Sequence, residues 1–207
     1  PGGPMRLIHP EPFGGAWDAR WIWHGRPAIV NETATRPVLS APADTVVLLR
    51  RELELDAVPA TVPTRLWVDG RFVLFVNGVE IARGPVRSDP RAVHYDWLDL
   101  APHLQVGTNV IAVIARHFGE ATSWWQPAPP TYSMGAGCLV FEAALGDELL
   151  VSDRSWRSHA GEAWTAVAIP GDVACLPLES FDARRLDPAW LTAGFDDSAW
   201  SKAFEIT

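Results

Sequence analysis

Two alternating apolar segments joined by Asn-Gly are the feature of this sequence that most restricts its fold. Residues 71–76 read Arg-Phe-Val-Leu-Phe-Val, residues 79–83 read Val-Glu-Ile-Ala-Arg, and only Asn77 and Gly78 lie between them. A two-residue loop of this kind favours a type I′ turn, because both of its residues need positive φ angles. The pattern therefore predicts a β-hairpin over residues 71–83.

Other short segments are also typical of strands, whereas no helical apolar stripe is longer than two turns. The predicted strands are residues 46–55, 64–69, 109–116, 138–145 and 148–152. One helical turn is predicted at residues 99–105, capped by Asp99 and ended by Gly107. The frequent Pro and Gly residues (18 and 16) lie between these short strands, so we expect an all-β protein, an antiparallel β-sandwich with little helix.

Three segments are predicted to be long loops, at residues 23–43, 118–137 and 164–180. Loops of this length in a compact domain often carry function or form interfaces. Residues 1–20 are expected to form an N-terminal extension, in which Pro1–Pro4 before Met5 is interpreted as a remnant of recombinant expression. Residues 21–207 are expected to form the sandwich.

Charge and composition exclude several classes of protein. The formal net charge is −8, and no Lys/Arg-rich run is present, which argues against nucleic acid and anionic membranes as partners. No apolar run is long enough for a transmembrane helix, and no signal-peptide pattern is visible, which favours a cytoplasmic location. Cys138 and Cys175 have no metal or redox spacing; Cys138 is expected to be a buried thiol, and a disulfide between the two stays open.

The 11 Trp residues are several times more than average usage for a chain of this length. Trp fills cores, and it also stacks on sugar rings, because an indole face matches the apolar C–H face of a pyranose. We expect Trp156, Trp190 and Trp200 to be core residues. The excess of Trp makes carbohydrate binding a function to consider.

Several motifs occur in a fixed order along residues 21–200. They are Asp69-Gly70-Arg71 with Leu74, Asn77 and Gly78; Tyr95-Asp96; Gly107 with Asn109–Val113; Ser152–Trp156; and Gly194–Trp200. In this order they resemble the jelly-roll modules of bacterial α-L-rhamnosidases and, more broadly, the galactose-binding-like sandwich domains of glycoside hydrolases. The resemblance implies a jelly-roll fold.

The rhamnosidase family carries its chemistry on a separate (α/α)₆ barrel that follows such modules, and this sequence does not contain that barrel. The resemblance therefore implies a non-catalytic domain that packs beside the catalytic domain of a glycoside hydrolase and contacts a rhamnose-containing or other glycan. The alternatives are a free-standing lectin-like module and a purely structural interaction domain. Related modules often hold a structural calcium, but no Asp/Asn spacing identifies a site here, and no other cofactor is expected.

No catalytic residue or metal ligand is assigned from the sequence. Glycoside hydrolysis needs two carboxylates that face each other across a sugar, and Asp196-Asp197 does not suggest such a pair, because Asp196 is expected to anchor a turn through its own backbone. The histidines show no HxH or HExxH spacing. His94 and His117 are expected to be hydrogen-bonded or surface residues.

Two segments supply candidates for sugar or interdomain contact. Arg83, Arg87 and Asp89 lie in a Pro-containing loop, where arginine forks suit carboxylates and sugar hydroxyls. Their alternatives are an internal network in which Asp89 pairs with Arg83 or Arg87, contact with the catalytic domain, or direct sugar contact. Trp124 and Trp125 are adjacent among prolines, and packing, interface and sugar contact stay open for them. We hypothesise that the two segments lie on one side of the sandwich and form one contact surface.

Overall fold

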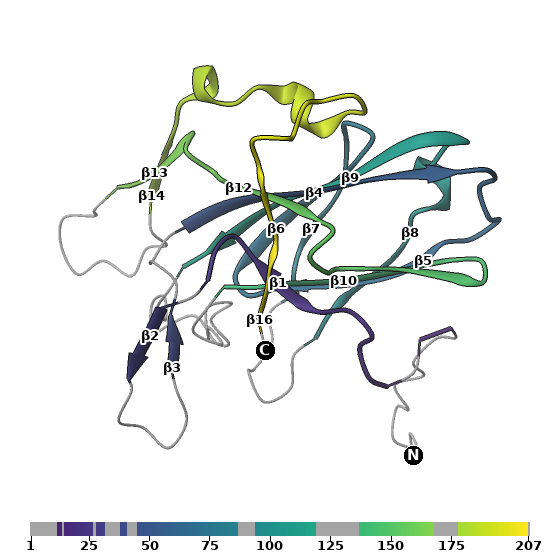
Figure 1. The fold of residues 1–207 in the computed structure, drawn as a ribbon, viewed down its shortest axis with the longest axis horizontal. Coiled ribbons are helices and arrows are strands. Elements are labelled where there is room, and N and C mark those ends of the chain that lie inside the picture. The colour runs from purple at the N-terminus through teal and green to yellow at the C-terminus, as the bar shows by residue number, and fades with distance from the viewer. Residues whose placement is uncertain are drawn as a thin grey trace, which may run out of the picture.

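The fold consists of two antiparallel sheets that stack face to face (Figure 1). The computed structural model describes residues 12–13, 15–26, 28–31, 38–40, 45–86, 94–118, 137–167 and 178–206. Within these ranges the helical elements are three short 3₁₀ turns, η1 (Ala101–His103), η2 (Ala183–Arg185) and η3 (Pro188–Leu191), and all other elements are strands. The predicted all-β sandwich with little helix is confirmed.

The first sheet has the strand order β16-β1-β10-β5-β8, and β11 pairs with β10 beside this path. Its strands are β1 (Trp21–Trp23), β5 (Pro63–Val68), β8 (Asp96–Asp99), β10 (Leu139–Leu145), β11 (Glu148–Val151) and β16 (Phe204–Ile206). The second sheet has the order β15-β12-β4-β9-β6-β7. Its strands are β4 (Thr45–Leu55), β6 (Arg71–Val76), β7 (Val79–Gly84), β9 (Gly107–His117), β12 (Arg157–Ala160) and β15 (Ser201–Lys202).

The Asn-Gly hairpin forms as the sequence predicts. Asn77 has a φ of 51° and Gly78 a φ of 82°, the two positive angles that a type I′ turn requires. The Asn77 side chain also ties the turn to β9, since its Oδ1 accepts from the Val110 N–H and its Nδ2 donates to Asn109 Oδ1, both at 2.9 Å. The hairpin is therefore fixed by its backbone geometry and by side-chain bonds to the neighbouring strand.

The main core lies between the two sheets and follows the alternation of the strands. Leu49 and Val113 of the second sheet and Leu66 and Phe141 of the first are fully buried. Trp156, which precedes β12, is also fully buried, and its indole N–H donates to the Val151 carbonyl at 3.0 Å. The central strands of each sheet thus bury one face, which fixes their register.

The outer faces of the sheets are partly covered by the segments that flank them. Residues 182–200, which contain η2 and η3, lie across the second sheet (Figure 1), and Trp190 packs there on Leu48 and Val110. On the first sheet, Phe13 and Ala19 are buried. This part of the N-terminal extension therefore contacts the sandwich.

Two of the three predicted long loops contain paired strands, so the expectation of irregular structure there was wrong. In residues 23–43, β2 (Ala28–Asn31) pairs with β3 (Val38–Ser40), and in residues 164–180, β13 (Trp164–Val167) pairs with β14 (Leu178–Phe181). These strands have only three or four residues each, too few for a period of two to be visible. The third loop, apart from Phe118 and Gly137, lies outside the described residues.

The predicted helical turn is shorter than residues 99–105, and the Asp99 side chain binds the first N–H of the turn from one residue before the N-cap position. The turn η1 begins after Leu100 and has no side-chain cap. Asp99 Oδ1 accepts from the N–H group of Ala101, the first residue of η1, at 3.0 Å and also from the N–H group of Val62 at 2.7 Å. Its carboxylate thereby joins the start of β5 to the end of β8.

Candidate functional site

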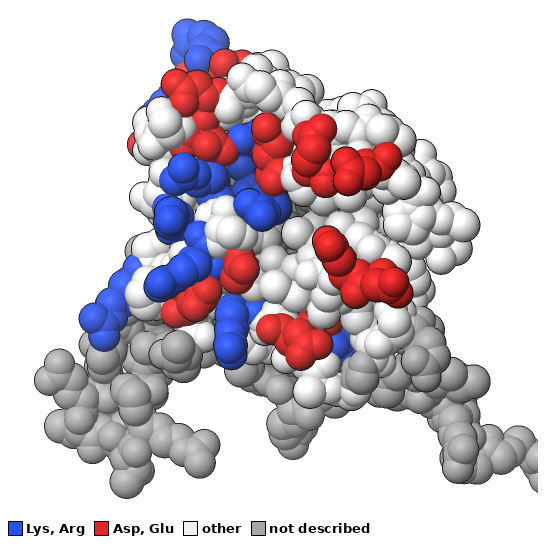
Figure 2. Space-filling view, turned by 45° about the vertical axis from the view of Figure 1, so that its right-hand side comes forward, with Lys and Arg blue, Asp and Glu red and all other residues white. Residues whose placement is uncertain are grey.

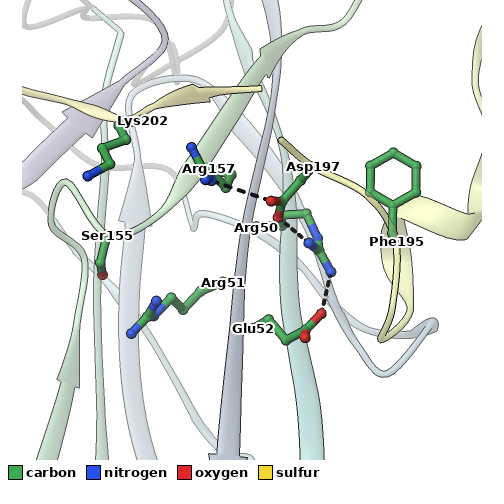
Figure 3. Close-up of a pocket in the computed structure, with 8 residues that line it drawn as sticks. All are labelled: Arg50, Arg51, Glu52, Ser155, Arg157, Phe195, Asp197 and Lys202. Carbon is green, nitrogen blue, oxygen red and sulfur yellow. Dashed lines mark hydrogen bonds and ion pairs between the residues drawn. The ribbon is translucent and has the colours of Figure 1, made fainter. Parts of the chain in front are cut away.

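A hollow rich in arginine opens where β12 begins beside β4, and we call it the arginine pocket (Figure 3). Strand β12 pairs with β4 only from Val47 to Arg50, so the pocket lies beside the part of β4 that β12 does not cover. Its volume is about 370 Å³, within the usual range for ligand sites. The lining residues are Arg50, Arg51, Glu52, Ser155, Arg157, Phe195, Asp197 and Lys202.

Arg50 is the buried arginine of the pocket, and groups of the protein itself occupy its donors. Its side chain is only 1% exposed, and it donates to Asp197, to Glu52 at 3.0 Å and to the backbone carbonyls of Trp190 and Thr192 at 3.1 and 3.2 Å. A buried guanidinium needs this many acceptors, because an unpaired charge would be costly. Arg50 therefore holds residues 190–197 against the second sheet and has little capacity left for a ligand.

The other cations of the pocket are less engaged. Arg157 contacts Asp197 at 3.4 Å, whereas no carboxylate among the described residues pairs with Arg51 or Lys202. The Nε of Arg51 is buried and has no hydrogen-bond partner within the described ranges. Figure 3 shows the Arg51 side chain extending toward Ser155 and away from Glu52, as alternation along a strand requires. The pocket can therefore offer two uncompensated cations to a ligand.

Charge on the molecule is segregated. Figure 2 shows Lys and Arg side chains gathered in a band on one face, bordered by Asp and Glu. In the arginine pocket four cationic side chains meet two carboxylates, which leaves a formal charge of +2 in a chain whose net charge is −8. Such a local reversal of sign attracts anions to one place on an acidic protein.

A second hollow, of about 630 Å³, lies on the outer face of the first sheet, and we call it the tryptophan hollow. The rings of Trp17 and Trp21 line it, half-buried, with their centroids 6.5 Å apart. Trp67 supports Trp21 from below in an edge-to-face contact at 5.6 Å. Arg20 and Glu205 supply polar groups to the lining, so aromatic faces and hydrogen-bonding groups occur together.

Asp69, His117 and Cys138 form a group that resembles a nucleophilic site in composition but is closed to solvent. His117 Nδ1 lies 3.6 Å from Asp69 Oδ2, and all three residues are buried. Burial, with the nearby Asp69 carboxylate, holds the pKa of the free Cys138 thiol well above its usual range. A neutral thiol without access is not a nucleophile. The expectation of a buried thiol at Cys138 is confirmed, whereas Cys175 lies outside the described residues.

The carboxylates singled out from the sequence have different structural partners. Asp196 accepts from the Ser198 N–H at 3.0 Å, and its side-chain and backbone bonds to Ser198 lower its pKa, so it anchors a turn as predicted. Asp197 instead bridges Arg50 and Arg157. Asp96 is a half-buried carboxyl whose pKa is raised by burial, with opposing contributions from a bond to Val86 and from Arg71.

The predicted contact candidates are placed only in part. Arg83 is exposed and donates two hydrogen bonds, at 2.6 and 2.8 Å, to Glu80, three residues earlier on the edge strand β7. Arg87, Asp89, Trp124 and Trp125 lie outside the described residues, so their roles and the shared contact surface stay predictions. His94 is exposed, and no cluster of metal-ligating side chains occurs in the described ranges.

Both hollows were missed in the sequence. The arginine pocket joins residues 50–52, 155–157 and 195–202, which only the pairing of β12 with β4 and β15 brings together. The Arg50-Arg51 pair was the visible signal, but its two side chains point to opposite faces of β4. The tryptophan hollow was not predicted because residues 17–20 were assigned to the N-terminal extension.

No helix in the part of the chain that the structure describes is long and apolar enough to cross a membrane.

Comparison with known proteins agrees with this architecture. A family model described as "Alpha-L-rhamnosidase N-terminal domain" matches residues 64–207. An α-L-rhamnosidase of Streptomyces avermitilis is 26% identical over 206 residues, covering 90% of this chain and 16% of that protein.

Among solved structures, a GH78 family rhamnosidase of Bacillus sp. GL1 has 29% identity and a TM-score of 0.70, covering 93% of this chain and 19% of that one. The α-L-rhamnosidase of Dictyoglumus thermophilum shares the fold, with a TM-score of 0.65 and 20% identity over 92% of this chain and 21% of its own. The chain thus spans about a fifth of these proteins. It belongs to the family of α-L-rhamnosidase N-terminal domains.

Proposed function

We propose that this chain is a non-catalytic, sugar-contacting domain of an α-L-rhamnosidase-type glycoside hydrolase, which packs beside the catalytic domain. The family assignment and the length of the matched relatives support the association with a larger enzyme. The single observation that carries the sugar contact is the tryptophan hollow, in which Trp17 and Trp21 lie beside Arg20 and Glu205.

The geometry of the tryptophan hollow suits a pyranose ring. Indole faces bind the apolar C–H face of a sugar, while neighbouring charged groups bind its hydroxyls. The Trp67 ring at 5.6 Å restrains Trp21, so less side-chain entropy is lost on binding than for a free indole.

A non-catalytic role is supported by the partners of two carboxylates, the buried Glu142 and the partly exposed Asp197. Glu142 is fully buried and paired with Arg65 at 2.6 Å, and Asp197 is held by Arg50 and Arg157. A glycosidase needs two carboxyl groups that both face the same sugar. These carboxylates face arginines of the protein instead.

The test uses the purified 207-residue chain with two assays. Aryl α-L-rhamnoside should not be hydrolysed, and methyl α-L-rhamnoside should shift the indole N–H resonances of Trp17 and Trp21 in ¹H–¹⁵N spectra. Trp21→Ala should abolish the shifts. Trp97→Ala is the matched control, because Trp97 is 40% exposed on β8, at the other edge of the same sheet, and should bind as the parent does.

Hydrolysis that a single Asp or Glu substitution abolishes would refute the non-catalytic role. An absence of saturable shifts at Trp17 and Trp21 would refute the sugar contact.

A further inference from the structure

We propose that the arginine pocket binds the carboxylate of an acidic sugar, a hexuronate residue of a glycan. This is a second site on the other sheet. It rests on the proposed function only in taking the ligand to be a sugar.

The charge balance of the pocket leaves two cations, Arg51 and Lys202, available to an anion. Arg50 is fully engaged by Asp197, Glu52 and backbone carbonyls. Arg51 and Lys202 have no carboxylate partner in the described ranges, and the buried Nε of Arg51 has no acceptor there. A partly desolvated guanidinium without an acceptor is unfavourable, so an anion that enters the pocket gains more than it would at an exposed arginine.

Carboxylate is the anion that this arrangement favours. A guanidinium presents parallel N–H groups that match the two oxygens of a carboxylate, while an ammonium binds as a point charge. Arg51 supplies the first kind of donor and Lys202 the second, and Ser155 lies between these two side chains in Figure 3.

The remaining groups suit a polyhydroxylated ring. Glu52, whose side chain is 39% exposed, and the half-buried Arg157 can accept from and donate to hydroxyls. The Phe195 ring lines the same hollow and offers an apolar surface. A volume of about 370 Å³ accommodates a small ligand such as one sugar residue rather than a protein segment.

The sequence provides a specific reporter for the test, since Lys202 is the only lysine in the chain. Protein labelled with ¹⁵N and ¹³C in lysine alone therefore gives one set of side-chain signals, all from the pocket. Titration with D-glucuronate or D-galacturonate should shift these signals saturably. Glucose and galactose should not shift them, and sodium acetate and sulfate at matched ionic strength should do so only at much higher concentration.

Arg51→Gln should weaken uronate binding by about tenfold or more, as expected for the loss of a charge-assisted hydrogen bond. Arg83→Gln is the matched control, because Arg83 is exposed at the opposite edge of the second sheet. This variant should bind uronate with the same affinity as the unmodified protein. Lys202→Gln, followed by calorimetry, gives an exposed second variant in case Arg51→Gln fails to fold.

The proposal is overturned if uronates give no saturable shift at Lys202, or if acetate or sulfate binds as tightly as the uronates. It is also overturned if Arg51→Gln and Lys202→Gln both retain the parent affinity. Shifts of Trp17 and Trp21 with the rhamnoside, together with a silent Lys202, would refute this inference alone and leave the proposed function standing.

Discussion

The guanidinium of Arg65 and the carboxylate of Glu142 form a buried ion pair at 2.6 Å between β5 and β10, with side-chain exposures of 2% and 0%. The Trp17 ring lies over the guanidinium at 4.1 Å, and Glu142 Oε1 accepts from the Ala19 N–H at 2.8 Å. One ion pair therefore links two strands to the segment that builds the tryptophan hollow.

Removal of one member of this pair should be strongly destabilising. Arg65→Met or Glu142→Leu alone leaves a buried charge without its partner, and each should lower the free energy of unfolding by about 3–5 kcal/mol. The double variant should lose less than the sum of the two. Urea unfolding measures these values, with Glu80→Gln as an exposed control that should not change stability. Additive losses would contradict the coupling.

Asp197 and Asp196 are adjacent, but only Asp197 should matter for the fold of the C-terminal segment. Asp197→Ala removes the carboxylate that binds Arg50, which is 1% exposed. The loss should be about 1.5–3 kcal/mol, as for hydrogen bonds to charged groups, and hydrogen exchange should become faster in residues 190–200. Asp196→Ala, which loses only a turn contact with Ser198, is the control. Equal effects of both changes would refute the assigned role.

Gly70 should be far less replaceable than Gly146, although both have positive φ angles. A Cβ at Gly70 would lie 2.0 Å from the Arg116 carbonyl oxygen, whereas a Cβ at Gly146 would meet nothing within 4 Å. Gly146→Ala should cost about 1 kcal/mol from backbone strain alone. Gly70→Ala should cost clearly more, because β9 must also move, and thermal unfolding of the two variants compares them. Similar melting temperatures would contradict the close approach.

Asp96 should make stability fall as the pH rises. Burial raises its folded-state pKa above the unfolded value of 3.8, so the native state binds the proton more tightly than the unfolded state does. The contribution is favourable below the unfolded pKa and is lost as the pH rises through the folded pKa. Asp96→Asn should therefore stabilise the protein at neutral pH, with a difference from the parent that shrinks as the pH falls toward 3.8.

Urea midpoints across this pH range measure the difference. Asp182→Asn is a control of opposite sign, since hydrogen bonds from Arg184 lower the pKa of Asp182. The contribution of Asp182 is present above its unfolded pKa and is lost as the pH falls through its folded pKa. A constant difference between the parent and Asp96→Asn at all pH values would refute the prediction for Asp96.

The sequence predicted the parts of the sandwich that depend on local residue pattern. Turn residues predicted the hairpin at Asn77-Gly78, and β-branched side chains predicted the long strands β4 and β9. Strands such as β1, β15 and β16 have three residues or fewer. These strands form because segments far away in the sequence pair with them, and local sequence does not predict such pairing.

The sites depended even more on such distant pairing. Arg83 looked functional because it lies among Arg, Asp and Pro, yet Glu80, three residues earlier, binds it. In the sequence Arg51 is one of an isolated pair of arginines. Only the fold brings Ser155 and Lys202 into the same pocket with it. Which residues come together therefore depended on the tertiary structure and could not be predicted from residue type and local sequence.

Strands β15 and β16 connect the two sheets, and this connection affects when the domain can fold during synthesis. Residues 201–206 supply β15 to one sheet and β16 to the other, with the buried Ala203 between them (Figure 1). Strand β16 pairs with β1, whose residues leave the ribosome about 180 residues earlier. The first sheet cannot complete the β16 edge before residues 204–206 have emerged, so closing it joins segments far apart in the sequence and gives the domain a high contact order.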